Sequence, residues 1–265
     1  MAISNTVNMD KKSRRKTRWI KERSMSGSTL KIIAIVTMLI DHVGASILEP
    51  HILKDVMMLS YDDMTTFLSN DLQLAIWYTI NCILRLTGRI AFPIFCFLLI
   101  EGFLHTKNVK KYAMRLLIFS ILSEIPFDLA FNGSILEFTY QNVFFTLFIG
   151  LWVLIGLKKH EGSDVKSQVI QLLIAIVGMA AAYFLKTDYS SFGIFYIVIL
   201  YYFRDNKVIR NVIGCVSIIW EVTGPLAFIP INMYNGKRGM NMKYIFYIFY
   251  PAHLLLLSFI AYYYF

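Results

Sequence analysis

The chain has 265 residues, of which 57% are hydrophobic and 16% are charged. Soluble domains carry about 25% charged residues, so this chain cannot hide its apolar surface inside one water-facing globule. The formal net charge is +9, which would favour nucleic-acid binding in a soluble protein. Here the basic residues gather in an N-terminal tail and between apolar segments, where they set membrane topology. We therefore expect a membrane protein that works in the lipid bilayer and has no nucleic-acid partner.

Residues 1–29 are polar and strongly basic, and we expect them to form a disordered cytoplasmic tail. A basic segment before an apolar one resembles a signal peptide. The apolar segment that follows is too long for the hydrophobic region of a signal peptide, and it lacks an A-x-A cleavage site. It is therefore predicted to be an uncleaved transmembrane helix, the first of a single membrane domain over residues 30–265.

Eight apolar stretches follow the tail, and a bilayer span needs about 20 residues with a floor near 17. The eight stretches are 30–48, 89–105, 110–131, 141–157, 168–185, 190–203, 208–230 and 243–263. A ninth stretch, 72–87, is apolar but short, and it contains Asn81 and Arg85.

Loop charges decide how the stretch 72–87 is placed. If it does not span, the acidic segment 49–71 lies outside and most basic loops lie inside with the tail, as the positive-inside rule requires. The exception is the basic segment 237–243, which would lie outside. If 72–87 spans, every later loop changes side and the rule fails repeatedly.

The prediction is therefore an all-α, polytopic membrane helical bundle with about eight transmembrane helices and one interfacial or re-entrant helix at 72–87. Both termini would be cytoplasmic and the protein would lie in the cytoplasmic (inner) membrane. Nine spans is the alternative.

Several ionisable residues fall inside the predicted spans, where each costs about 2.5–3.5 kcal/mol on insertion scales. Such residues normally face a bundle interior or a wet cavity and pair with one another. Each alone is compatible with a structural hydrogen bond or ion pair, but the whole set indicates a functional site. The residues are Asp41, His42, Arg89, Glu101, His105, Glu124, Asp128, Glu221 and His253.

A helical rise of 1.5 Å per residue sorts these residues by depth. His42 and Arg89 fall roughly 18 and 24 Å from the inner face, and Glu124 and Asp128 roughly 21 and 27 Å. We expect these four side chains to meet in one layer in the outer half of the bilayer. There Glu124 or Asp128 would orient His42 or pair with Arg89.

A second layer is predicted near the inner face. Glu101 and His105 are separated by one helical turn and share a helix face, so they are expected to lie together, at the entrance to the site. Metal ligands are available in both layers, but the sequence contains no HExxH motif and no close histidine pair. No metal is expected.

Several segments resemble the TraX family. They are LKIIAIVTMLIDHVGA (30–45), GRIAFPIFCFLLIEGFLHTKN (88–108), KYAMRLLIFSILSEIPFDLAFN (111–132), FFTLFIGL (144–151) and YPAHLLLL (250–257). The DH, GRIAFP, EGF and SEIPFD elements occur in the expected order. Founding members of the family acetylate the N-terminal amine of conjugative pilin subunits. The family is also distantly similar to a superfamily of membrane acyltransferases, in which a histidine near the end of the first span is essential and acyl-CoA enters from the cytosol.

The resemblance implies an integral membrane acetyltransferase. It would move an acetyl group from cytosolic acetyl-CoA to an acceptor amine on a peptide or pilin N-terminus, or to a surface glycan hydroxyl. The matched motif positions imply catalytic roles for Asp41, His42, Arg89, Glu124 and Asp128, with His253 as a further candidate. The residues expected to bind acetyl-CoA are Glu101, His105, Lys107, Lys111 and Arg115.

Each of these roles has a chemical basis. Lysine and arginine on inner loops suit the phosphates of coenzyme A, although the same residues also set topology. His42 would act as a general base toward the acceptor, or would carry the acetyl group as a covalent intermediate. Arg89 would stabilise the developing oxyanion.

Two other classes of function remain open. A proton-coupled small-molecule transporter also needs intramembrane acids and histidines, although we find no inverted repeat of the kind common in transporters. A structural or assembly protein of the membrane is the third possibility, but it does not require so many buried charges.

Overall fold

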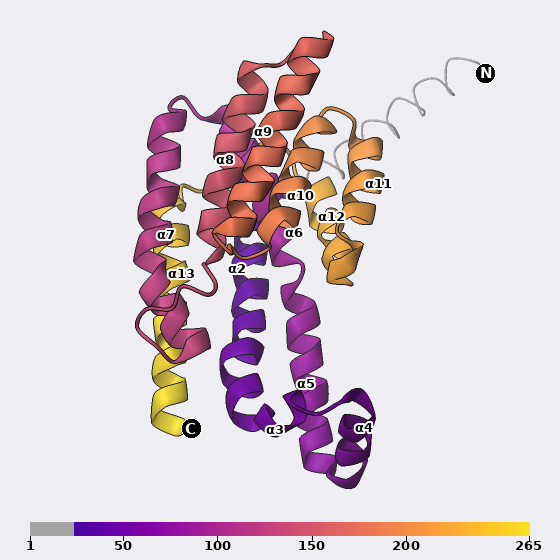
Figure 1. Ribbon diagram of the computed structural model, residues 1–265, viewed down its shortest axis with the longest axis vertical. Coiled ribbons are helices and arrows are strands. Elements are labelled where there is room, and N and C mark those ends of the chain that lie inside the picture. The colour runs from indigo at the N-terminus through magenta and orange to yellow at the C-terminus, as the bar shows by residue number, and fades with distance from the viewer. Residues whose placement is uncertain (1–23) are drawn as a thin grey trace, which may run out of the picture.

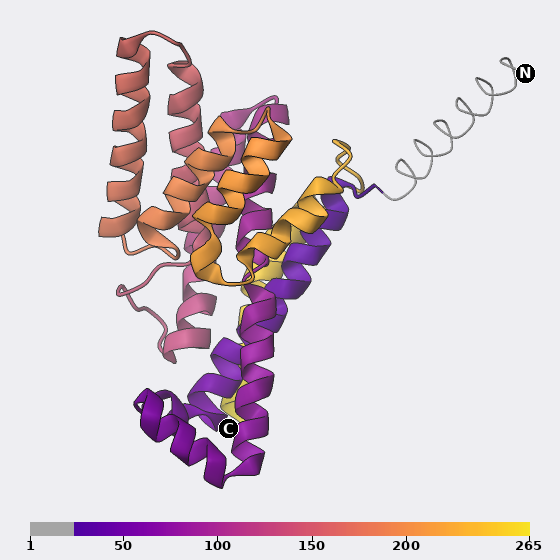
Figure 2. The ribbon, with the colours of Figure 1, turned by 90° about the vertical axis from the view of Figure 1, so that its right-hand side faces the viewer.

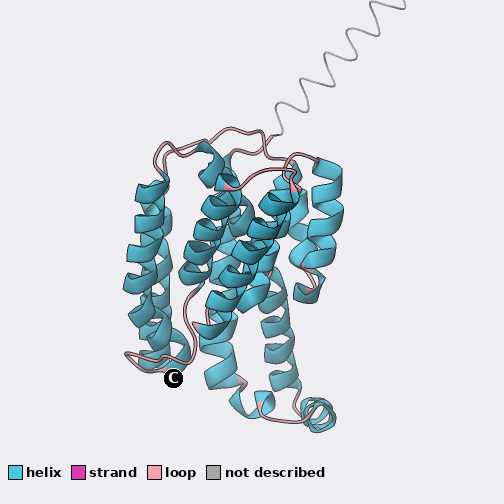
Figure 3. Cartoon of the chain, turned by 45° about the horizontal axis from the view of Figure 1, so that its top comes forward, coloured by secondary structure: helices cyan, strands magenta, loops and turns pink. Residues whose placement is uncertain are grey.

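A computed structural model describes residues 24–265, apart from the side chain of Lys243, and every regular element in this range is a helix (Figure 1; Figure 3). The all-α expectation is confirmed for this part of the chain. Most of the predicted tail, residues 1–23, lies outside the described residues. The first described helix begins at Gly27, earlier than predicted, because the Ser26 side chain accepts a hydrogen bond from the Thr29 amide and caps it.

The elements run in this order: α2 (Gly27–Val43), π-helix η1 (Gly44–Ile52), α3 (Lys54–Met57), α4 (Tyr61–Asn70), α5 (Leu72–Gly88), α6 (Ala91–His105), α7 (Val109–Asn132), α8 (Val143–Lys159), α9 (Val165–Phe184), α10 (Ser190–Tyr202), α11 (Lys207–Ser217), the 3-10 turns η2 (Ile219–Glu221) and η3 (Gly224–Ala227), α12 (Phe228–Asn232) and α13 (Lys243–Tyr264).

Four helices are long and apolar enough to cross a membrane by length and composition. They are Gly27–Ile52, Leu72–His105, Val165–Phe184 and Tyr244–Tyr264. The protein therefore has the helices of a membrane protein, but the predicted eight spans are not confirmed.

The segment 72–105 is one long element rather than a separate interfacial or re-entrant helix followed by a span. A single turn at Arg89 and Ile90 joins α5 to α6, and the two helices run in the same direction (Figure 1). At 34 residues the element is about 51 Å long. Gly88 explains the close packing of α5 on α2, since an added Cβ would lie 2.1 Å from the Asp41 Cβ.

The bundle is built around a ring of five helices. Neighbouring contacts link α2 to α6, α6 to α8, α8 to α7, α7 to α13 and α13 back to α2. Helices α9 and α10 pack on the outer side of α8 (Figure 2). The hydrophobic core lies where α6, α8 and α10 meet. Gly150 makes room there, because a Cβ at this position would lie 2.5 Å from the Ile197 side chain.

The stretch 208–230, predicted as one span, is broken and reverses direction. Helix α11 ends at Ser217, and the chain turns through η2 and η3 before α12. Val222 takes a left-handed backbone conformation with φ 54°, and Pro225 stands near the start of η3. The following loop then reaches the beginning of α2, where the Gly27 amide donates to the Lys237 carbonyl at 2.8 Å.

Helix α13 runs parallel to α2. Near the start of both helices, Lys31 Nζ lies 5.0 Å from the centre of the Phe246 ring. Beyond their far ends, the rings of His51 and Phe265 stack at 5.4 Å. The described chain therefore begins and ends at opposite ends of the bundle (Figure 1). The expectation that both termini lie on one side does not fit this arrangement, because the segment 207–232 turns back instead of crossing.

Candidate functional site

Two neighbouring cavities lie in the bundle and share part of their lining. The first, of about 580 Å³, is called the basic cavity for its lining of Lys31, Lys107, Arg115 and Arg238. The second, of about 380 Å³, is called the histidine cavity because it contains His42. Both volumes fall in the usual range for small-molecule sites, about 300–1,000 Å³. The cavities share four lining residues: Met38, Phe95, Val143 and Tyr250.

The basic cavity draws its cations from different elements. Lys31 belongs to α2, Lys107 follows α6, and Arg115 belongs to α7. Arg238 lies in the loop that follows α12 and reaches the start of α2. Glu101 is the one acid in the lining. The remaining walls are mostly leucine, phenylalanine and tyrosine. This combination fits an anionic ligand with an apolar portion.

The predicted inner layer lies in this cavity. His105 Nδ1 is 2.9 Å from the Glu101 carbonyl oxygen and 3.8 Å from its carboxylate. The Tyr234 hydroxyl donates to the same carboxylate, and burial together with that negative charge raises the pKa of Tyr234 to about 12. The phenol therefore stays protonated. Lys111 is not part of the cavity lining, because its side chain is exposed on the first turn of α7.

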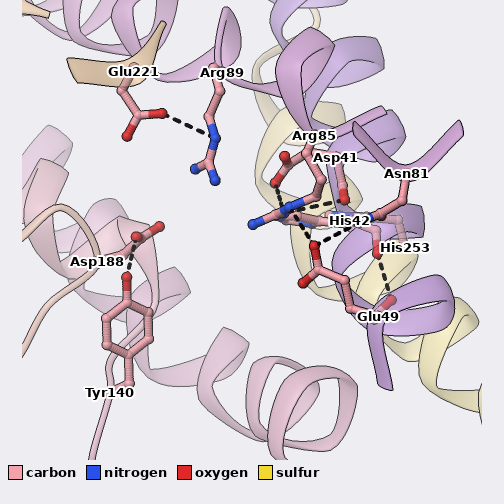
Figure 4. Close-up of polar contacts among 11 residues, drawn as sticks. Asp41, His42, Glu49, Asn81, Arg85, Arg89, Tyr140, Asp188, Glu221 and His253 are labelled. Carbon is pink, nitrogen blue, oxygen red and sulfur yellow. Dashed lines mark hydrogen bonds and ion pairs between the residues drawn. The ribbon is translucent and has the colours of Figure 1, made fainter. Parts of the chain in front are cut away.

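The histidine cavity holds a direct contact between two imidazoles. His42 Nδ1 lies 2.7 Å from His253 Nε2 (Figure 4). His253 Nδ1 lies 2.8 Å from the backbone carbonyl of Phe249 on the same helix. His42 lines the cavity, whereas His253, which is only 4% exposed, stands behind it in α13.

Asp41 is held by Arg85 rather than by the neighbouring histidine. Arg85 Nη1 lies 2.7 Å from Asp41 Oδ2, and Arg85 Nε lies 3.1 Å from Glu49 Oε1. Asn81 donates to Glu49 at 3.2 Å. Figure 4 shows these side chains side by side near His42. The network joins α2, η1 and α5 and leaves Asp41 as a fixed negative charge in the wall of the cavity.

Two further polar pairs involve residues that line the cavity. Arg89 Nε lies 3.2 Å from Glu221 Oε2, at the tip of the broken segment, and the guanidinium also hydrogen-bonds with Tyr189. Across the cavity the Tyr140 hydroxyl donates to Asp188 at 2.6 Å (Figure 4). Arg89 is therefore paired with a carboxylate, and this pairing favours its charged form at the cavity.

Glu124 and Asp128 do not take the predicted places beside His42 and Arg89. Glu124 accepts from the Asn142 amide at 3.0 Å and from its side chain at 2.6 Å. Asp128 accepts from the Glu137 amide at 2.8 Å. Neither acid lines the histidine cavity. Their carboxylates instead fix the loop between α7 and α8, because that loop offers unpaired backbone N–H groups.

A stretch of π-helix follows His42 directly. Residues 44–52 form η1, with Pro50 inside it. Gly44 allows the close approach of α5, since a Cβ there would lie 2.7 Å from Asn81 Oδ1 and 3.1 Å from Arg85 Cδ. π-Helical turns are rare and often occur at functional sites. Here the altered winding brings Glu49 to Arg85.

No cluster of three or more metal-ligand side chains occurs within residues 24–265. The structure adds Arg85, Glu49, Tyr140 and Asp188 to the predicted site. Arg85 has a signal in the sequence, because it is a charge inside the apolar stretch 72–87. Asp188 carries a weaker signal, an acid between two apolar stretches.

Comparisons with known proteins identify a family and a relative for this chain. The TraX protein family matches residues 26–261. The chain is also similar to a probable fimbrial assembly protein, FimC of serogroup H1, from Dichelobacter nodosus. The two are 28% identical over 263 residues, covering 88% of this chain and 94% of the relative. No solved structure matches the chain. Because the family match covers nearly the whole described chain, including the helices that build both cavities, the chain belongs to the TraX family.

Proposed function

We propose that this protein is an integral membrane acetyltransferase that uses cytosolic acetyl-CoA, with His42 as the general base. The main observation in support is that the basic and histidine cavities share the walls formed by Met38, Phe95, Val143 and Tyr250. A long donor held by its anionic end in the first cavity can therefore extend its reactive end toward the second.

The chemistry of acetyl-CoA fits the basic cavity. Its phosphates need several cations, which Lys31, Lys107, Arg115 and Arg238 supply. Its pantetheine arm is thin and only moderately polar, and suits the apolar wall between the phosphate end and His42. Glu101, as the one acid in this lining, is free to accept from amide or hydroxyl donors of such an arm.

The charge distribution supports an orientation in the cytoplasmic membrane. The loop after α12 returns to the start of α2, so Lys237 and Arg238 lie at the same end of the bundle as Lys31 and Lys107. The basic segment 237–243, which broke the positive-inside rule in the eight-span prediction, then lies on the same side as the other basic loops. The basic cavity then faces the cytosol, and the acidic segment 49–71 faces the opposite side.

The nitrogen or oxygen of the acceptor attacks the thioester carbonyl carbon while His42 Nε2 removes its proton. The C–S bond then breaks, and the departing thiolate takes that proton from His42. Arg89, a cation in the same cavity, stabilises the negative charge on the carbonyl oxygen. Asp41 and Arg85 fix the wall of the cavity and take no part in bond breaking.

The acceptor we propose is a pilin or peptide N-terminal amine. The support is the family membership together with the relative named for fimbrial assembly. A surface glycan hydroxyl is the second acceptor class, because a general base serves amines and hydroxyls alike.

The test is acetyl transfer by purified protein in detergent. Acetyl-CoA labelled in the acetyl group is supplied with a pilin N-terminal peptide, or with an acetylatable glycan, and the products are read by mass spectrometry. Appearance of an acetylated amine supports the proposal, and an acetylated glycan alone would change the acceptor. Lack of transfer to either, with uptake of a small molecule by proteoliposomes, would favour a proton-coupled transporter.

A further inference from the structure

The contact between His42 and His253 has a defined direction of hydrogen bonding. A backbone carbonyl can only accept, so the contact between His253 Nδ1 and the Phe249 carbonyl at 2.8 Å places a proton on Nδ1. In a neutral ring the other nitrogen, Nε2, then carries a lone pair. That nitrogen lies 2.7 Å from His42 Nδ1, so His42 Nδ1 must be the donor.

The ring geometry agrees with this direction. The two imidazole planes differ by 8° and their centres are 5.0 Å apart. That separation is what a 2.7 Å N···N contact gives when two rings meet edge to edge in nearly one plane. The rings are therefore joined through their in-plane nitrogens and are not stacked face to face. Phe131 meets His42 edge-on at 5.2 Å and restricts its rotation.

We infer that His253 is a positioning residue that holds His42 in the tautomer with Nδ1 protonated and Nε2 free. This inference rests on the proposed function, since it specifies which nitrogen acts as the base. The tautomer of a histidine is set by the hydrogen bond its other nitrogen makes. With Nδ1 committed to His253, Nε2 is the nitrogen that His42 can present to the histidine cavity.

The arrangement also serves the charged form of His42. When Nε2 takes a proton, Nδ1–H still donates to the lone pair of His253, and His253 still donates to the Phe249 carbonyl. His253 itself neither gains nor loses a proton. The imidazolium is thus stabilised by a neutral acceptor, which costs less desolvation than a second buried charge. This arrangement needs no carboxylate behind His42, and Glu124 and Asp128 bond to the loop between α7 and α8 instead.

Nitrogen-15 NMR of the histidine rings tests the tautomer directly, with no donor or acceptor present. The purified protein is labelled in histidine, and the His42 signals are assigned by their loss in His42→Gln. Wild type is expected to show His42 protonated at Nδ1 and bare at Nε2. His253→Gln keeps an acceptor and should preserve this state, whereas His253→Phe should lose it. A wild-type His42 protonated at Nε2 would overturn the inference, whether or not the protein transfers acetyl groups.

Kinetics provides the second readout. In His253→Phe, kcat for acetyl transfer should fall by at least about tenfold, which is part of the 10²–10⁴-fold that a general base supplies. KM for acetyl-CoA should not change, and His253→Gln should recover part of kcat. His51→Phe is the control, because His51 lines neither cavity. An unchanged kcat in a folded His253→Phe protein would contradict the positioning role.

Discussion

Lys31 and His42 stand on one face of α2, and each lines a different cavity. They are eleven positions apart, about 16 Å along the helix and close to three full turns. One rigid helix therefore fixes the distance between a cation that suits a phosphate and an imidazole that suits a thioester. Under the proposed function, this spacing would let a long anionic donor be anchored at one end of the bundle and react farther inside.

The role of Lys31 predicts a selective effect on donor binding. Lys31→Met keeps the length of the side chain and removes its charge, so KM for acetyl-CoA should rise by about 10- to 100-fold, as expected for a charged hydrogen bond worth about 1.5–3 kcal/mol. The value of kcat should change little. Steady-state transfer assays measure both. The control is Lys54→Met, an exposed position at the opposite end of the bundle, and an equal rise in KM there would contradict the assignment.

The pair formed by Arg89 and Glu221 predicts a stability difference. Glu221→Ala leaves the Arg89 guanidinium without its carboxylate, and we expect the free energy of unfolding to fall by about 1.5–3 kcal/mol. Glu161→Ala removes the exposed partner of Arg204 and should cost no more than about 1 kcal/mol. Unfolding by a denaturing detergent compares the two. Equal losses would show that Glu221 does not hold the broken segment against α6.

Replacing Gly88 with alanine is expected to disturb the packing of α5 on α2. A methyl group at this position would meet the Asp41 side chain at 2.1 Å, so Gly88→Ala must push α5 away from α2 or displace Asp41 from Arg85. Overpacking of this kind costs about 1–3 kcal/mol. Gly133→Asn is a suitable control, because its left-handed backbone tolerates asparagine and nothing lies within 4 Å of an added Cβ. Thermal unfolding in detergent that left both variants equal to wild type would contradict the close approach.

Because the chain reverses direction within 207–232, the loop containing Lys237 and the segment containing Asp62 should lie on opposite sides of the membrane. In a background with Cys82, Cys96 and Cys215 replaced, a cysteine at Lys237 should react with a membrane-impermeant maleimide only after the cytosolic side is opened. A cysteine at Asp62 should react in intact spheroplasts. Labelling of both from the same side would contradict the proposed topology.

Much of the fold follows from local properties of the sequence. The apolar stretches predict helices because a bilayer forces backbone N–H and C=O groups to pair within each segment. The break at 218–227 also has a local signal, since Glu221 and the Gly224–Pro225 pair interrupt the apolar run. The prediction of one span over 208–230 is wrong because it rests on the average hydrophobicity of the stretch, which hides this break.

The pairing of charges could not be predicted in the same way. Depth along a helix placed Glu124 at the level of His42, but it could not show which way each helix turns its side chains. Glu124 instead meets the Asn142 amide, and His42 meets His253, 211 positions away in the chain. Such contacts depend on helix rotation and order, which only packing decides.

The most direct test of the account is acetyl transfer by His42→Gln, purified in detergent and compared with wild type. We predict a folded variant with the thermal stability of wild type, unchanged acetyl-CoA binding, and a loss of kcat of at least about 10²-fold. A His42→Gln protein that acetylates its acceptor at the wild-type rate would contradict the claim that this imidazole, in the wall of the histidine cavity, is the base of the reaction.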